Sequence, residues 1–264
     1  MKLTIEHETH YQYGTAVTRS TQYLRLTPRP SPLIKVHDWQ LDLPGSVVPG
    51  IDAYGNVLHV MTLDQPHSSI RLVASGVVET RDDIGTPHEA GALPVALFLR
   101  PSDLTRVDAP LADFADGFAA DVGAQCGAGL ERLAQELRLR MPFTPGVTHS
   151  LTSASEAFSA GLGVCQDHSH VFLACARRLG VPARYVSGYL ATDRSHVDSH
   201  AWVEVWRDDA WWGMDISNGC LTDGHYVRLA IGHDYQDACP VRGVRLGGGE
   251  EALSSQAIVS HDEQ

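Results

Sequence analysis

The stretch GLGVCQDHSHVFLACARRL, residues 161–179, decides the fold of the second half of this chain. From Val164 onward its apolar residues recur at spacings of three and four, which predicts an amphipathic helix. Gly180 follows directly and is a typical residue for ending a helix. Cys165 therefore lies in the first turn of the predicted helix. Free backbone N–H groups and the helix dipole favour a thiolate there, so this cysteine is a candidate nucleophile.

A predicted β-hairpin further along the chain supplies partners for this thiol. Two strand patterns, residues 199–206 and 210–215, flank a turn at 208–209. Such a turn pairs residues whose numbers sum to 417, so His200 and Asp215 become diagonal neighbours on one face, about 7 Å apart at Cα. The spacing predicts a carboxylate that orients an imidazole, which in turn activates the thiol.

Structural roles for the same residues stay open at this point. A cysteine in an apolar helix is often a core residue, and Cys175, in the middle of the predicted helix, is expected to be one. An aspartate at the end of a strand often caps a turn. The residue pattern alone therefore allows both a catalytic and a structural Cys165.

Four ordered segments carry a family resemblance. Together they resemble the core of the transglutaminase-like superfamily, in particular its bacterial branch of transglutaminase-like proteins and cysteine proteases. Further segments at both ends are similar to the same branch, so the resemblance spans nearly the whole chain. The core segments are residues 161–170, 180–189, 199–206 and 212–218, and the further segments are residues 54–59, 66–67, 230–237 and 240–243.

The resemblance assigns the nucleophile, base and orienting carboxylate to Cys165, His200 and Asp215. Two departures from the family pattern stand close to these positions. Residues 216–218 read Ile-Ser-Asn where Pro-Thr-Asn is usual, and His168 replaces a residue that is usually aromatic or apolar. The first departure keeps the carboxylate, and the second places a titratable group one helical turn from the nucleophile.

The implied chemistry is acyl transfer on a peptide or amide substrate through a Cys165 thioester. Hydrolysis, by a cysteine peptidase or amidase, is the expected outcome by analogy with the family. An amine-accepting protein-glutamine transglutaminase shares the first half-reaction and is the alternative within the same chemistry. A non-catalytic scaffold that binds peptides is the alternative from a different functional class. None of these functions requires a cofactor.

The rest of the chain predicts an α+β protein in two parts. Short alternating stretches up to about residue 100 indicate an antiparallel β domain, and a polar segment rich in Gly and Pro, residues 81–94, reads as a linker. We therefore expect an N-terminal β-rich domain over 1–95. A papain-like, transglutaminase-type domain is expected over 96–264, with a helix packed on an antiparallel sheet and the C-terminal strands included.

Composition excludes several other classes of protein. The 264 residues carry 20 Lys plus Arg against 32 Asp plus Glu, a net charge of −12, which argues against binding to nucleic acid or to anionic membranes. No stretch approaches the ~18 apolar residues of a membrane span, and the first residues alternate like a strand rather than a signal peptide. The five cysteines are scattered without a CxxC pair, so a reduced, cytoplasmic protein is expected.

The tryptophans near the candidate site are candidates for core packing or for contact with a substrate. Strand parity places three tryptophans of the hairpin on the face of His200, and core packing is expected for most of them. Trp202 is the one expected to line a substrate.

A metal site is the other possibility that the residue types near the candidate site offer, but without an HExxH or paired CxxC pattern we expect none. Its ligands would be Cys165, His168, His170 and His196.

Overall fold

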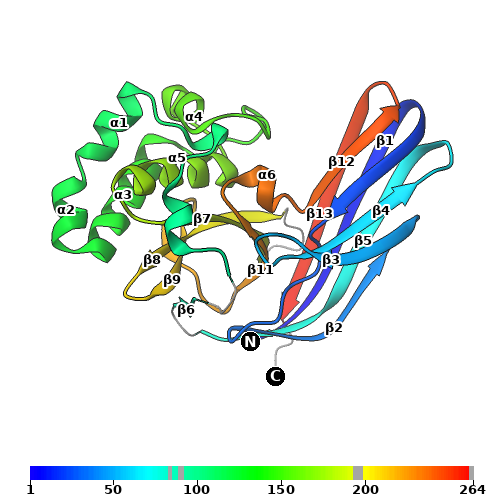
Figure 1. The fold of residues 1–264 in the computed structure, drawn as a ribbon, viewed down its shortest axis with the longest axis horizontal. Helices are drawn as coiled ribbons and strands as arrows, with labels where there is room; N and C mark the ends of the chain where they lie inside the picture. The colour runs from blue at the N-terminus through cyan, green and yellow to red at the C-terminus, as the bar shows by residue number, and fades with distance from the viewer. Residues whose placement is uncertain (83–84, 89–91, 193–198, 262–264) are drawn as a thin grey trace.

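The computed structural model describes residues 1–82, 85–88, 92–192 and 199–261. Two antiparallel sheets form the body of the molecule, and the helices gather on one side of the second sheet (Figure 1). This arrangement confirms the predicted α+β class. Among the described residues, no helix is both long and apolar enough to cross a membrane.

The first sheet is built around one long strand, β1 (Lys2–Leu24). Its residues 2–13 lie between two strands of the sheet, and its residues 17–24 lie between two others. The pairing register shifts between these two parts of β1. Alternate side chains of β1 are buried, as expected for a sheet with one covered face. The other strands of this sheet are β2 (Ile34–Asp42), β3 (Ser46–Ile51), β4 (Val57–Leu63), β5 (His67–Thr80), β12 (Val241–Gly247) and β13 (Glu251–His261).

The last two strands correct one expectation from the sequence. We expected the C-terminal strands within the catalytic domain, but β12 and β13 both pair with β1. In Figure 1 they run beside the N-terminal strand, where Leu3 pairs with His261. The first sheet is therefore made from both ends of the sequence, and the second half of the chain returns to complete it.

The second sheet has the order β10-β9-β8-β7-β11, with β6 beside β9. Segment 81–94, expected as a linker, contributes β6 to this sheet. The apolar residues of β8 that point away from His200 pack against helix α5 in one core. The strands are β6 (Thr86–Pro87), β7 (Ala183–Leu190), β8 (His200–Arg207), β9 (Ala210–Asp215), β10 (Cys220–Leu221) and β11 (Tyr226–Gly232).

Helix α5 (Cys165–Arg178) is the central helix of the second half, and its residues from Asp167 to Arg177 are buried. Cys175 is fully buried, as expected for a core residue. The helices around α5 fill the layer that covers the second sheet. They are α1 (Ala109–Asp116), α2 (Ala119–Ala124), α3 (Cys126–Arg140), α4 (Ala154–Ala160) and α6 (Tyr235–Ala238), with short 3-10 turns η1 (Val95–Leu99) and η2 (Asp103–Thr105).

The β8–β9 hairpin has the predicted register. Its pairs, such as Val203 with Met214 and Trp206 with Trp211, all sum to 417. Asp208 and Asp209 both have positive φ, 51° and 57°, which is the backbone of a type I′ turn. Because the turn fixes the register, it also fixes where His200 and Asp215 stand relative to each other.

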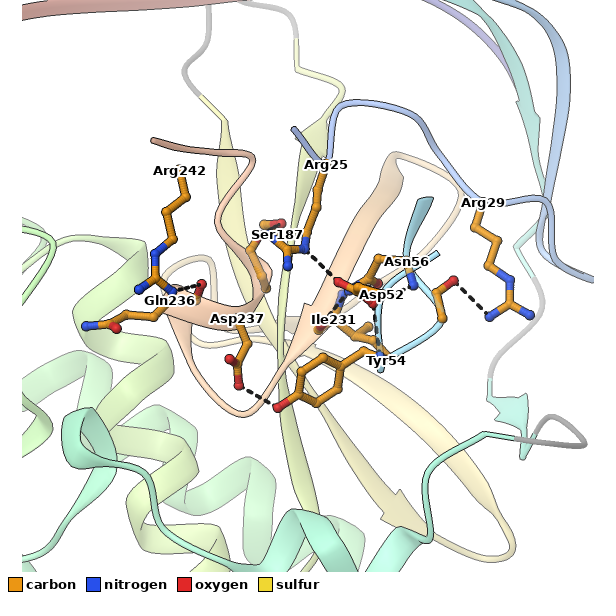
Figure 2. Close-up of polar contacts among 12 residues, drawn as sticks. Arg25, Arg29, Asp52, Tyr54, Asn56, Ser187, Ile231, Gln236, Asp237 and Arg242 are labelled. Carbon is orange, nitrogen blue, oxygen red and sulfur yellow. Dashed lines mark hydrogen bonds and ion pairs between the residues drawn. The ribbon is translucent and has the colours of Figure 1, made fainter. Parts of the chain in front are cut away.

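A polar clasp joins the two halves of the molecule (Figure 2). The side-chain amide of Asn56 donates to the carbonyl of Ile231 at 2.8 Å and accepts from its N–H at 2.9 Å. Tyr54 donates its hydroxyl to Asp237 at 2.5 Å. The clasp thus brings together segments 54–59 and 230–237, two of the segments that carried the resemblance.

Candidate active site

Cys165 is the first residue of α5 and is partly exposed. The helix start is held by Asp167, whose Oδ2 accepts from the backbone N–H of Val164 at 2.8 Å and from the hydroxyl of Thr148 at 2.7 Å. A Cβ on Gly163 would lie 2.6 Å from that of Asp167, so this position needs glycine for the carboxylate to reach back. The thiol thus stands at the N-terminal end of α5, the end of a helix where backbone N–H groups have no partner within the helix, and solvent can reach it.

His200 begins β8, and its Nε2 lies 2.6 Å from Oδ2 of Asp215 at the end of β9. Asp215 is fully buried and accepts further hydrogen bonds from the backbone N–H of Asn218 (3.1 Å), its side-chain amide (2.7 Å) and the hydroxyl of Tyr226 (2.9 Å). Burial alone would raise the pKa of Asp215, but the hydrogen bond and charge of His200 and the two hydrogen bonds from Asn218 lower it. The carboxylate is therefore charged and fixed in place.

The imidazole of His200 interacts with the Cys165 thiol as well as with Asp215. Burial disfavours the charged ring, yet hydrogen bonds to both partners and their negative charge raise the pKa of His200 to about 10. Since Nε2 faces Asp215, the remaining ring nitrogen, Nδ1, serves the thiol. Asp215 thus contacts His200, and His200 interacts with Cys165, in the order that the sequence predicted.

Trp202 stands behind this histidine and is 2% exposed. Its ring stacks beside that of His200 with centroids 6.3 Å apart and meets Tyr226 edge-on at 5.3 Å. Gly188 on β7 makes room for it, because a Cβ there would clash with the indole ring. Trp202 therefore packs behind the candidate base and does not offer the exposed aromatic wall that the sequence suggested.

The two positions that depart from the family pattern, His168 and the segment 216–218, contact each other through Ser217. His168 Nδ1 accepts from the hydroxyl of Ser217 at 2.9 Å, and its Nε2 donates to the carbonyl of Met141 at 2.7 Å. Burial lowers the pKa of His168, so the ring is neutral, and this tautomer satisfies both bonds. His168 thereby ties α5 to the turn that follows Asp215.

The other histidines considered as metal ligands have separate places. His170 is fully buried, and its Nε2 accepts from the backbone N–H of Tyr235 at 3.1 Å. Burial lowers its pKa to about 3. His196 lies outside the described residues. Within the described ranges, no group of three or more His, Cys, Asp or Glu side chains is arranged to hold a metal ion.

Tyr226 is the site residue that the sequence did not reveal. It opens β11, which pairs with β7 and not with β9, so its approach to Asp215 depends on the order of strands in the whole sheet. The apolar run 226–231 marks a strand but does not tell which side chain meets the carboxylate. Asn218 could have been found, since it lies three residues after Asp215 in the same turn.

Comparisons with known proteins bear on the family and the fold of the chain. The profile of the transglutaminase-like superfamily core matches residues 113–216, and that of the bacterial transglutaminase-like N-terminal region matches residues 3–79. An uncharacterized protein of Mycobacterium leprae is 29% identical over 274 residues, covering 96% of both chains. An uncharacterized protein of Mycobacterium tuberculosis is 28% identical over 289 residues, covering 96% of this chain and 90% of that protein.

A solved structure shares the fold over the full length. It is a protein from Cytophaga hutchinsonii whose name describes it as a candidate cysteine protease. The TM-score is 0.77 at 19% identity, covering 100% of this chain and 92% of that chain. Residues 113–216 thus form a core of the transglutaminase-like superfamily, and residues 3–79 form a bacterial transglutaminase-like N-terminal region.

Proposed function

We propose that this protein catalyses thiol-dependent acyl transfer on peptide or amide substrates, with Cys165 as nucleophile, His200 as acid and base, and Asp215 as orienting carboxylate. The observation that carries the proposal is the contact of His200 Nε2 with Oδ2 of Asp215, at 2.6 Å, on a ring that also interacts with Cys165 at the start of α5. A carboxylate that orients an imidazole beside a thiol is an arrangement that activates cysteine nucleophiles, and the raised pKa of His200 supports the proposal.

In the first half-reaction, the Cys165 thiolate attacks the amide carbonyl carbon and forms a C–S bond. The negative charge moves to the carbonyl oxygen, where N–H groups of the first turn of α5 are suited to stabilise it. As the C–N bond breaks, the His200 imidazolium gives its proton to the leaving amine. The products are a thioester, a free amine and a neutral imidazole.

In the second half-reaction, neutral His200 removes a proton from the acceptor as the acceptor attacks the thioester carbon. The C–S bond breaks and the thiolate leaves, again facing an imidazolium. With water as acceptor the product is a carboxylic acid, and with a primary amine it is a new amide. We favour water as the acceptor by analogy with the family. We place the reaction in the cytoplasm because all five cysteines are free thiols.

An experiment that separates the two acceptors is turnover of a peptide library with and without added methylamine, followed by mass spectrometry of the products. Hydrolysis predicts acid products whose yield methylamine hardly changes. Methylamide products at the expense of the acid would instead identify a transglutaminase. Wild-type protein that turns over no peptide, with Cys165 unreactive in the folded state, would favour the non-catalytic scaffold.

A further inference from the structure

A cavity of about 330 Å³ lies between the first sheet and the second half of the molecule, apart from the candidate active site. Strands β1, β12 and β13 form one wall, and the segment around Ser150 and Leu151 forms another together with α6. Its volume is at the small end of the range for ligand pockets, and interfaces between two parts of a protein are frequent places for them. The segments 230–237 and 240–243, singled out in the sequence, both contribute to its lining.

Three polar side chains of β1 line this cavity without a hydrogen-bond partner among the described residues. Gln22 is 3% exposed, Tyr11 is 8% exposed and Tyr13 is 4% exposed. Their polar atoms are not among the fully buried, unpartnered atoms of the described residues, so these atoms are open to the cavity. Three such groups on one cavity are available to a ligand with hydrogen-bonding groups.

The backbone is shaped to present these groups. The register shift between Val17 and Arg19 changes which side chains of β1 face the cavity, so that Gln22 lies on the same covered face as Tyr11 and Tyr13. On the neighbouring strand, a Cβ at Gly243 would lie within 2.6 Å of the Gln22 amide nitrogen. Glycine at this position therefore leaves the space that the buried amide fills.

The charge of the lining favours an anion, although the chain as a whole carries a net charge of −12. Arg245 is neutralised by Glu251 at 3.1 Å and donates to the carbonyls of Gly247 and Gly249. Arg242 contacts only the carbonyl of Gln236, at 3.4 Å, among the described residues (Figure 2). One guanidinium thus has donors to spare at the cavity, and carboxylate is a preferred partner of this group.

We propose that the cavity binds the carboxylate-bearing end of a short peptide, with Arg242 on the carboxylate and with Gln22 and the two tyrosine hydroxyls on the peptide groups. Leu151 and Leu253, exposed by 60% and 57%, also line the cavity and can cover aliphatic parts of the ligand. The wall is joined to α5, because Gln166, the residue after Cys165, donates to the carbonyl of Ser150 at 3.3 Å. The proposal concerns binding and does not depend on the thioester chemistry.

The test is calorimetric titration of the full chain carrying Cys165→Ala, which excludes turnover of the probe. The probe is N-acetyl-Ala-Ala with a free carboxyl group, compared with its C-terminal amide. We expect the acid to bind, and the amide to bind at least about tenfold more weakly because it loses a charge-assisted hydrogen bond. Absence of binding, or equal affinity for acid and amide, would overturn the proposal.

Variants then locate the site. Arg242→Gln and Gln22→Leu should each weaken binding of the acid by about tenfold or more. Arg19→Gln, an exposed arginine on the same strand, and Tyr23→Phe, an exposed tyrosine matched to Tyr11→Phe, should leave binding unchanged. An Arg242→Gln variant that binds like the parent, or an equal loss in Arg19→Gln, would contradict the assignment.

Thermal unfolding separates a ligand site from a structural one. Gln22→Leu and Tyr11→Phe remove polar groups that lack a protein partner, so the free protein should melt at the same temperature or higher. Loss of binding with no loss of thermal stability is the expected result. A lower melting temperature in both variants would show that these groups serve the fold, and would overturn the proposal.

Discussion

At the scale of single residues, the hydrogen bonds around Asp215 explain why His200 stays charged. Three donors besides the imidazole converge on one buried carboxylate, from Asn218 and Tyr226. The sequence was enough to bring His200 and Asp215 together, because their spacing around a short hairpin leaves little freedom. It could not reveal Tyr226, whose position depends on contacts between strands that are not neighbours in sequence.

Replacement of Asp215 by asparagine should shift the pH dependence of the reaction. In the wild type the imidazolium persists up to about pH 10, and activity should fall as the pH rises through that value. Without the carboxylate, burial still disfavours the charged ring and the pKa of His200 falls. The alkaline limb of the kcat/KM profile should then move to lower pH, and kcat should drop by up to about 10⁴, as for the equivalent change in serine proteases.

The matched control for this variant is Asp209→Asn at the exposed hairpin turn. Asparagine tolerates the positive φ of that position, so neither kcat nor the profile should change. An Asp215→Asn protein with the wild-type alkaline limb would mean that another group sets the protonation of His200.

Alkylation rates of individual cysteines provide a second test at this scale. Cys165 should react with iodoacetamide faster than the other four at pH 7, because it alone faces an imidazolium at a helix start. Cys220 is the useful comparison, since it is exposed but burial of its sulfur raises its pKa. Peptide mapping over time measures both rates, and faster labelling of Cys220 in the folded protein would count against Cys165.

At the scale of elements, α5 and the β8–β9 hairpin followed from the sequence because each has a strong local signal. The helix has a continuous apolar face and a glycine stop, and the hairpin has a turn that fixes its register. Strand β12 had no such signal. Its side chains are mostly exposed and it contains glycine at 243 and 247, so no alternation marks it.

The contact between His168 and Ser217 links these elements, and Ser217→Ala tests its role. The variant leaves Nδ1 of a buried imidazole without a donor, which should lower the free energy of unfolding by about 1–3 kcal/mol. We also expect a lower kcat with little change in KM, because the turn after Asp215 loses its tie to α5. Urea denaturation and steady-state kinetics measure the two effects.

Ser254→Ala is the control, a serine on strand β13 whose side chain is exposed. It should change neither quantity. If Ser217→Ala behaves in the same way, the bond between α5 and the turn contributes nothing measurable.

At the scale of the whole molecule, both chain ends build the first sheet, and the polar clasp fixes that sheet to the second half. Segments 54–59 and 230–237 were visible in the sequence as family motifs, but their meeting was not, since about 175 residues separate Asn56 from Ile231. The wrong prediction that β12 and β13 belong to the second domain has the same cause. Pairing between distant strands depends on the topology of the chain, which local patterns do not encode.

The clasp can be tested with Asn56→Ala. The change leaves the partly buried N–H and C=O of Ile231 without these partners, so the free energy of unfolding should fall by about 1 kcal/mol for each group. Gln40→Ala removes an exposed amide from the same sheet and should have almost no effect. Urea denaturation measures the free energy of unfolding of both variants. Equal values for the two would mean that the clasp does not stabilise the protein.

The central claim is that Cys165 carries a covalent acyl group during turnover, and mass spectrometry of the trapped enzyme tests it most directly. Wild-type protein is mixed with a peptide library, quenched in acid within the first turnover and digested. We expect an acyl adduct on the peptide that contains Cys165, with its amount reduced by His200→Ala. An adduct on another residue, or turnover that persists in Cys165→Ala, would contradict it.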